Sequence, residues 1–289
     1  MKFWTIAVTA LLAAFVQFAT VAEARNQFNQ TEAINIDPQK AYFFFRANDR
    51  REMQFIREVT PEQLAIWRAA RAEALARAVA RYERDERSYQ AEVAFCRDRP
   101  PPCMAIVRPT PVSDATFPYP PPEADNFVSV ERGPQFTRVG DDNSYLVTVP
   151  PGSYIFYGPV FRNGAQAAGF CMCMGSLRFT ARAGQIVDLG EIRFPDSDVQ
   201  NARAQRPNAP RIATAEIHPY QPNMTRPDRL NGLPIVPAEW RAADKVPNYF
   251  GILIDRHPPV PGVLRYERDR VIDDRTGTDP VPLAPLDGR

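Results

Sequence analysis

The stretch GFCMCMGSLRFTARAGQIVDLGEIRF, residues 169–194, decides how this chain folds. From residue 176 to residue 182 apolar and polar side chains alternate, which predicts a β-strand with one face in a protein core and the other in water. A second alternating run covers residues 186–194, and the turn residues Ala183, Gly184 and Gln185 lie between the two runs. We therefore predict a β-hairpin here and a mainly β fold overall.

The same alternation places the two cysteines of this stretch. Counted backward through Gly175, it points Cys171 and Cys173 into the core and the neighbouring Met172 and Met174 outward. On an extended strand, Cα atoms two residues apart are separated by about 6.6 to 6.8 Å, which is the upper limit for a disulfide. We therefore expect each cysteine to find a partner elsewhere in the chain.

The chain has four cysteines, so the remaining candidates are Cys96 and Cys103. Crossed pairing would fix the loop around Cys96 and Cys103 to the strand, and the first closure would stabilise the fold by up to about 4.5 kcal/mol. One alternative is a local bridge from Cys96 to Cys103 beside a free dithiol at Cys171 and Cys173. The other is a set of reduced, redox-active thiols. Adjacent Cys and Met side chains on opposite faces of a strand do not favour a Cu(I) site, because its sulfur ligands must converge.

The N-terminus predicts export. Lys2 precedes an almost unbroken apolar run over residues 3–21, which ends in Ala22-Glu23-Ala24, a pattern typical of signal-peptidase cleavage. We predict a signal peptide over residues 1–24 and a periplasmic, cell-surface or secreted mature protein, where disulfides persist. The alternative is a retained membrane anchor. No later stretch is apolar for 18 residues, so we expect no transmembrane segment in the mature chain.

Charge and composition limit the partners. The sequence has 35 basic and 34 acidic residues, a formal net charge of +1, so electrostatics give no reason to expect nucleic acid as a partner. Thirty prolines among 289 residues is about twice the usual share. They are concentrated in residues 100–122 and from residue 195 onward. We read residues 196–289 as a proline-rich extension that wraps the core.

One long helix is predicted at about residues 60–95. Thr60-Pro61-Glu62-Gln63 combines an N-cap threonine, a proline at the first helical position and a capping-box glutamine. No glycine or proline follows until after residue 95. Apolar residues recur along one stripe, at Leu64, Trp67, Leu75, Val79, Tyr82, Tyr89 and Val93. We expect this stripe to pack the helix on the core; the alternative is a partner-binding or dimerising arm.

The remaining strands complete a domain over residues 25–195. Residues 40–46, KAYFFFR, predict a strand buried on both faces, and strands are also expected at residues 127–132, 145–149 and 153–157. Further strands are expected at residues 249–255 and 263–272. The predicted fold is an antiparallel β-sandwich with one long α-helical insertion and a proline-rich C-terminal extension.

A family resemblance supports this reading. The run YLVTVPPGSY at residues 145–154, interpreted as a hairpin, together with the strand pair at residues 179–189, resembles the prealbumin-like sandwich modules of carboxypeptidase regulatory-type domains and of many exported bacterial proteins. The resemblance covers about residues 127–194. It implies a binding or structural unit and no catalytic residue.

No catalytic motif stands out. The two histidines, His218 and His257, each precede a proline and have no metal-ligand spacing, so we expect no metal and no cofactor. We expect an exported, non-enzymatic envelope protein that contacts an unknown protein or an envelope polymer. The alternatives are a secreted hydrolase that pairs carboxylates such as Asp255, Asp269 and Asp273, and a thiol- or copper-handling protein.

Overall fold

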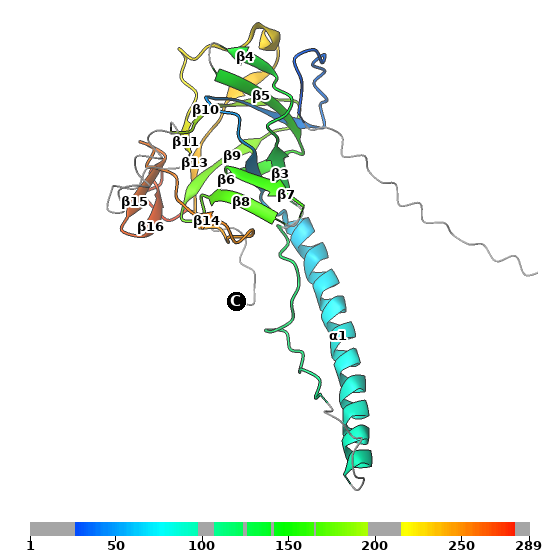
Figure 1. Ribbon diagram of the computed structural model, residues 1–289. Coiled ribbons are helices and arrows are strands. Elements are labelled where there is room, and N and C mark those ends of the chain that lie inside the picture. The colour runs from blue at the N-terminus through cyan, green and yellow to red at the C-terminus, as the bar shows by residue number, and fades with distance from the viewer. Residues whose placement is uncertain are drawn as a thin grey trace, which may run out of the picture.

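The protein is a mainly β sandwich with one helical insertion, as the sequence predicted (Figure 1). The computed structural model describes residues 27–97, 107–123, 126–139, 142–164, 166–195 and 215–280. The predicted signal peptide over residues 1–24 and Cys103 lie outside these residues. Among the described residues, no helix is both long enough and apolar enough to span a membrane.

Two sheets form the sandwich. The first has the order β11 (Glu216–His218), β10 (Ile186–Arg193), β1 (Ala41–Ala47), β5 (Asp142–Val149), β4 (Thr137–Val139), and β12 (Ile235–Pro237) also pairs with β10. The second has the order β13 (Arg241–Ala243), β9 (Ser176–Ala181), β6 (Gly152–Gly158), β2 (Met53–Arg57), β3 (Phe127–Val130). A smaller sheet joins β14 (Leu253–Ile254), β8 (Gln166–Cys171) and β7 (Val160–Asn163), and β15 (Leu264–Glu267) pairs with β16 (Arg270–Asp273).

Aromatic rings fill the space between the two large sheets. Phe43 of β1 packs against Phe55 of β2, with ring centroids 4.8 Å apart, and meets Phe179 of β9 edge-on at 5.7 Å. Buried aromatic side chains carry most of the apolar area of such a core, and edge-on contacts are favoured by the ring quadrupole. This aromatic cluster is the centre of the main hydrophobic core.

Strand β1 is buried along its whole length, as the run KAYFFFR predicted. Phe43 and Phe45 point into the sandwich. Tyr42 and Phe44 point to the opposite face, where they pack with Phe28 of the N-terminal segment and Leu230 of the C-terminal segment. Phe136, Leu146 and Ile186, from the middle of the chain, belong to the same cluster. The strand is doubly buried because N- and C-terminal segments cover the outer face of its sheet.

Two predicted hairpins are wrong. At Pro150-Pro151-Gly152 the chain leaves β5, which pairs with β1 and β4, and enters β6, which pairs with β2 and β9. The turn therefore crosses from one sheet to the other. Residues 169–194 likewise divide among β8, β9 and β10, which lie in three different sheets. Alternation specifies which face of a strand is buried, and it does not specify the neighbouring strand.

The C-terminal third pairs with the body. Strands β11 and β12 extend the first sheet, β13 the second and β14 the small sheet. Trp240 is buried, and its indole N–H donates to the carbonyl of Leu189 at 3.3 Å. The single strand expected at residues 263–272 is the hairpin β15–β16, which turns at Arg268 with a φ of 58°. The strand expected at residues 249–255 is reduced to the two residues of β14.

Candidate functional site

Cys171 and Cys173 are bonded to each other, so the predicted crossed pairing is wrong. Their Cα atoms are 5.1 Å apart, well inside the range that a disulfide accepts. The extended geometry assumed from the sequence does not hold, because β8 ends at Cys171 and the chain turns over residues 173–175 before β9 begins. The alternative with a free dithiol at this position is also wrong.

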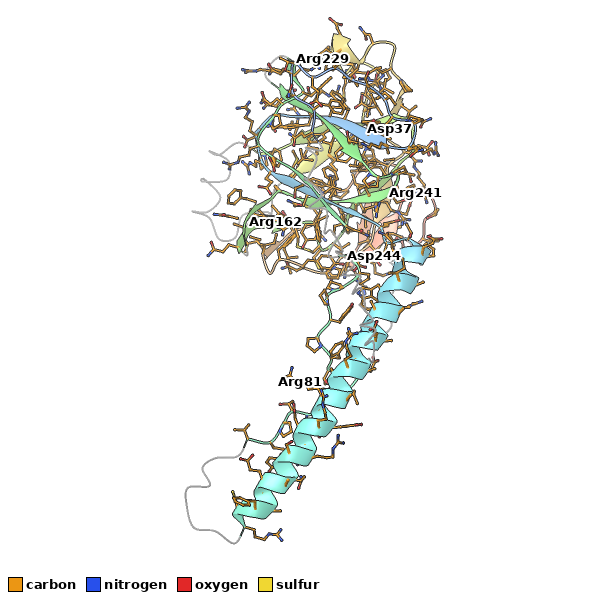
Figure 2. The ribbon with its side chains drawn as sticks, turned by 90° about the vertical axis from the view of Figure 1, so that its right-hand side faces the viewer. Asp37, Arg81, Arg162, Arg229, Arg241 and Asp244 are labelled. Carbon is orange, nitrogen blue, oxygen red and sulfur yellow. A yellow bond between two sulfur atoms is a disulfide. The ribbon has the colours of Figure 1, made fainter. Side chains whose placement is uncertain are left out.

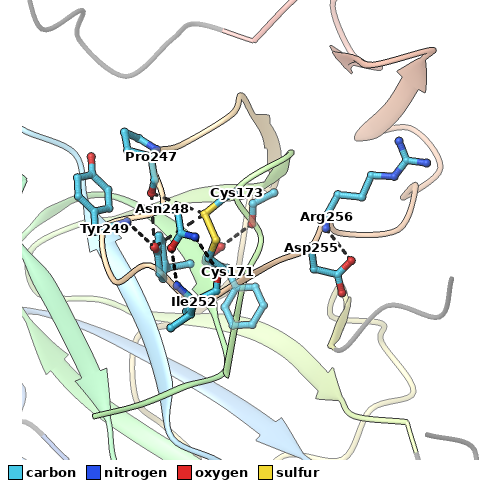
Figure 3. Close-up of a disulfide and its surroundings, with 11 residues drawn as sticks. Cys171, Cys173, Pro247, Asn248, Tyr249, Ile252, Asp255 and Arg256 are labelled. Carbon is cyan, nitrogen blue, oxygen red and sulfur yellow. Dashed lines mark hydrogen bonds between the residues drawn. A yellow bond between two sulfur atoms is a disulfide. The ribbon is translucent and has the colours of Figure 1, made fainter. Parts of the chain in front are cut away.

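The disulfide lies in a corner that holds the C-terminal segment, and we call residues 171–175 the cysteine corner (Figure 3). The carbonyls of Cys171 and Cys173 accept hydrogen bonds from the N–H groups of Asp255 and Val246, at 2.7 and 3.1 Å. Sγ of Cys173 lies 3.6 Å from the carbonyl oxygen of Pro247. The corner thus docks residues 246–257 on the sandwich.

Tyr157 lies beside the disulfide and binds the same C-terminal segment. Its hydroxyl accepts a hydrogen bond from the N–H of Tyr249 at 3.0 Å and donates to the carbonyl of Pro247 at 3.4 Å. Burial raises the pKa of Tyr157 to about 12, so the hydroxyl keeps its proton at neutral pH. The neutral hydroxyl therefore holds the backbone of Pro247 and Tyr249 beside the disulfide.

The sulfur atoms of the corner are not available for exchange at the surface. Cys171 is fully buried and Cys173 is 3% exposed. The predicted parity is wrong: Met172, not the cysteines, lies in the main core with Leu177 and Phe179. Cys171 and Cys173 are buried in a separate hydrophobic cluster on the other side of the strand. Cys96 is also disulfide-bonded, and no described cysteine is free. These observations do not favour a thiol- or copper-handling protein.

The helix α1 (Pro61–Cys96) has the predicted capping box but does not pack on the core. The N–H of Gln63 donates to the Thr60 hydroxyl, and Oε1 of Gln63 accepts from the N–H of Thr60. None of its 36 residues is buried, and at about 1.5 Å per residue it reaches roughly 54 Å. Figures 1 and 2 show it leaving the body, with Arg81 far from the sandwich.

The predicted apolar stripe is half-buried because another segment of the chain covers it. Residues 107–123, which we call the strap, run back along α1 (Figure 1). The Trp67 indole N–H donates to the carbonyl of Pro120 at 2.8 Å, and its ring meets that of Tyr119 edge-on. Arg71 forms an ion pair with Asp114. We call α1 and the strap together the arm.

The root of the arm is anchored by a buried polar cluster. Oδ1 of Asn126 lies 3.4 Å from Nε2 of Gln63 and 3.5 Å from Nη2 of Arg57, which are long hydrogen bonds. Glu123 is 2% exposed. Burial raises the pKa of Glu123, because the charged form loses its hydration. The arm therefore leaves the body from a defined attachment.

The carboxylates and histidines singled out in the sequence do not assemble a reaction centre. Asp273 is buried and ion-paired with Arg241 at 2.7 Å, whereas Asp269 is exposed in the β15–β16 turn. Asp255 is buried at the cysteine corner, and His257 is buried nearby. No three His, Cys, Asp or Glu side chains of the described ranges are grouped so that they could hold a metal ion.

One buried charge cluster had no signal in the sequence. Asp188 has a fully buried side chain and binds Arg46 at 3.2 Å and Arg226 at 2.8 Å, and it also accepts from the N–H of Gly190. It sits where the alternation of β10 predicts an outward, hydrated residue. The segment that carries Arg226 covers this face and excludes water. The guanidinium groups of Arg46 and Arg226 donate hydrogen bonds to the carboxylate in place of water.

Searches against protein-family models, curated proteins and solved structures found no match to this chain.

Proposed function

We propose that this is an exported, non-enzymatic protein of the cell envelope that contacts a protein or a surface polymer through its arm. The observation that carries the proposal is a helix of 36 residues without one buried residue, held away from the body. A helix adds to the stability of a globular domain mainly by burying an apolar face on it. α1 instead uses its apolar stripe to hold the strap. We infer that the length of the helix serves to extend the arm away from the body.

Export is supported by two independent features. The first is the signal-peptide pattern of residues 1–24. The second is the state of the described cysteines, all of which are disulfide-bonded, since disulfides are rare in reducing compartments. The proposed resemblance to prealbumin-like modules agrees with a binding or structural role.

The body supports a scaffold role. Its interior is filled with aromatic side chains, and two of its buried carboxylates, Asp188 and Asp273, form ion pairs with arginines. Turnover of any substrate by the purified protein, abolished by changing one polar residue, would overturn the non-enzymatic part of the proposal.

Site-specific photo-cross-linking tests the role of the arm. A benzophenone amino acid would replace Ile66, which is 70% exposed, or the exposed Ser88, in the full-length protein expressed in its own cells. The matched control carries the same amino acid at Arg182, an exposed position on the body. We expect adducts from both arm positions and none from Arg182. Adducts only from Arg182, or none at all, would contradict the proposal.

A further inference from the structure

The face of α1 that points away from the strap is a second, uncovered surface. Nine of its residues recur at steps of three or four and all are exposed: Ala65, Ala69, Ala72, Ala76, Ala80, Glu83, Arg87, Ala91 and Ala94. Such spacing aligns side chains along one side of a helix. We call this surface the outer face.

The charges on the outer face are arranged in a specific way. Glu83 and Arg87 are its only charged members, they have opposite sign, and they are four residues apart. Neighbouring charges on α1 pair along the helix, as Arg77 does with Glu73. Neither Glu83 nor Arg87 forms an ion pair within the part of the chain that the structure describes. Their charges are available to a partner.

We propose that the outer face binds a second copy of this chain, with the two α1 helices antiparallel. The inference rests on the proposed function, because it names the partner of the arm. A two-fold axis near residue 85 brings Glu83 of each copy opposite Arg87 of the other. Such an interface is isologous, the commonest arrangement in soluble oligomers.

The same two-fold axis matches the rest of the distal outer face. It sets Ala76 opposite Ala94, and it brings Ala80 and Ala91 within one residue of facing each other, so that small side chains meet small side chains. Alanine faces let helices approach to the lower end of the usual interaxial distance of about 8–10 Å. One axis therefore satisfies both the charges and the packing.

The body does not obstruct this pairing. At about 1.5 Å per residue, residue 85 lies roughly 36 Å from the start of α1, and the partner helix ends roughly 17 Å beyond the axis. The partner helix thus stops about 20 Å short of the body. The strap contacts α1 at Trp67, Arg71 and Glu86, none of which belongs to the outer face, so it stays in place in the dimer.

Charge reversal on the mature, oxidised full-length protein tests the proposal by sedimentation velocity over a range of concentrations. The variants are E83R, R87E and the double variant E83R/R87E, with circular dichroism as a check on folding. We expect a dimer that each single variant weakens by about tenfold, since like charges then face each other twice. The double variant should regain the original affinity, because the two pairs are restored with their signs exchanged.

Three results would overturn the proposal: a monomer at every concentration, a dimer that ignores both single changes, or a double variant as weak as the single ones. A parallel dimer sets each residue against its own copy and gives the second of these results. A monomer whose arm still cross-links another molecule from Ile66 would refute self-association and leave the proposed function standing. A protein that stays monomeric and whose arm cross-links no other molecule would refute both self-association and the proposed function.

Discussion

Acid is expected to destabilise this protein through one buried side chain, His257. The imidazole is 1% exposed. Its Nε2 accepts a hydrogen bond from the N–H of Ile217 at 2.7 Å, and its Nδ1 lies 2.7 Å from the carbonyl oxygen of Pro258. These partners require the neutral ring with the proton on Nδ1. Burial lowers the pKa of His257 to about 4, because a buried charge would lose its hydration.

The size of the effect follows from proton linkage. Between pH 6.5 and pH 4 the unfolded chain binds a proton at this residue and the folded protein does not. The free energy of unfolding therefore falls by about 1.4 kcal/mol per pH unit, and by roughly 3 kcal/mol over the window. The contribution is fully present above pH 6.5 and is lost as the pH falls toward 4.

Urea denaturation at half-unit steps from pH 7.5 to pH 4 measures this loss. The matched control is H257Q, whose side-chain oxygen can accept from the N–H of Ile217 but cannot titrate. Every other titrating group is present in both proteins. Subtracting their free energies of unfolding at each pH therefore leaves the contribution of His257. We expect the difference in unfolding free energy to change by roughly 3 kcal/mol across the window. Parallel curves for the two proteins would refute the reasoning.

Three further predictions concern the disulfide, the root of the arm and a glycine of β8. Non-reducing tryptic mapping is expected to give residues 163–178 as one peptide with an internal disulfide, and a link to another peptide would contradict the cysteine corner. E123Q is expected to raise the free energy of unfolding at pH 7, because ionisation of the buried acid opposes folding, and urea titrations should show the gain vanish below about pH 4.5. G169A would place a Cβ 2.2 Å from the Pro159 carbonyl oxygen, so it should lose well over the roughly 1 kcal/mol expected for G232A, which has open space; equal losses in thermal denaturation would contradict this.

The features that the sequence predicted well are those set by local chemistry. The capping box at Thr60 and Gln63 fixes the start of α1 without help from the rest of the fold. The aromatic run of β1 predicts burial on both faces whichever strands surround it. In each case the residues named in the pattern also make the stabilising contacts.

The errors arise where distant segments decide the outcome. Nothing in residues 169–175 shows that β8 ends at Cys171, and one local turn there converts an improbable disulfide into the observed one. Asp188 gave no signal because its partner Arg226 lies 38 residues away along the chain. The stripe of α1 was correctly located, but the sequence could not show that the strap would compete with the core for it.

The arm has consequences for how the protein unfolds. Because α1 buries nothing on the sandwich, its distal half depends on helix propensity, on ion pairs along the helix and on the strap, which are each worth little. Units of low local stability open without global unfolding. The amide protons around Arg81 should therefore exchange with solvent sooner than those of β1, while the sandwich stays folded. Pairing of the outer faces would slow exchange on α1 and leave β1 unchanged, so exchange measured at two protein concentrations separates the helix held by the strap alone from the helix held by a partner.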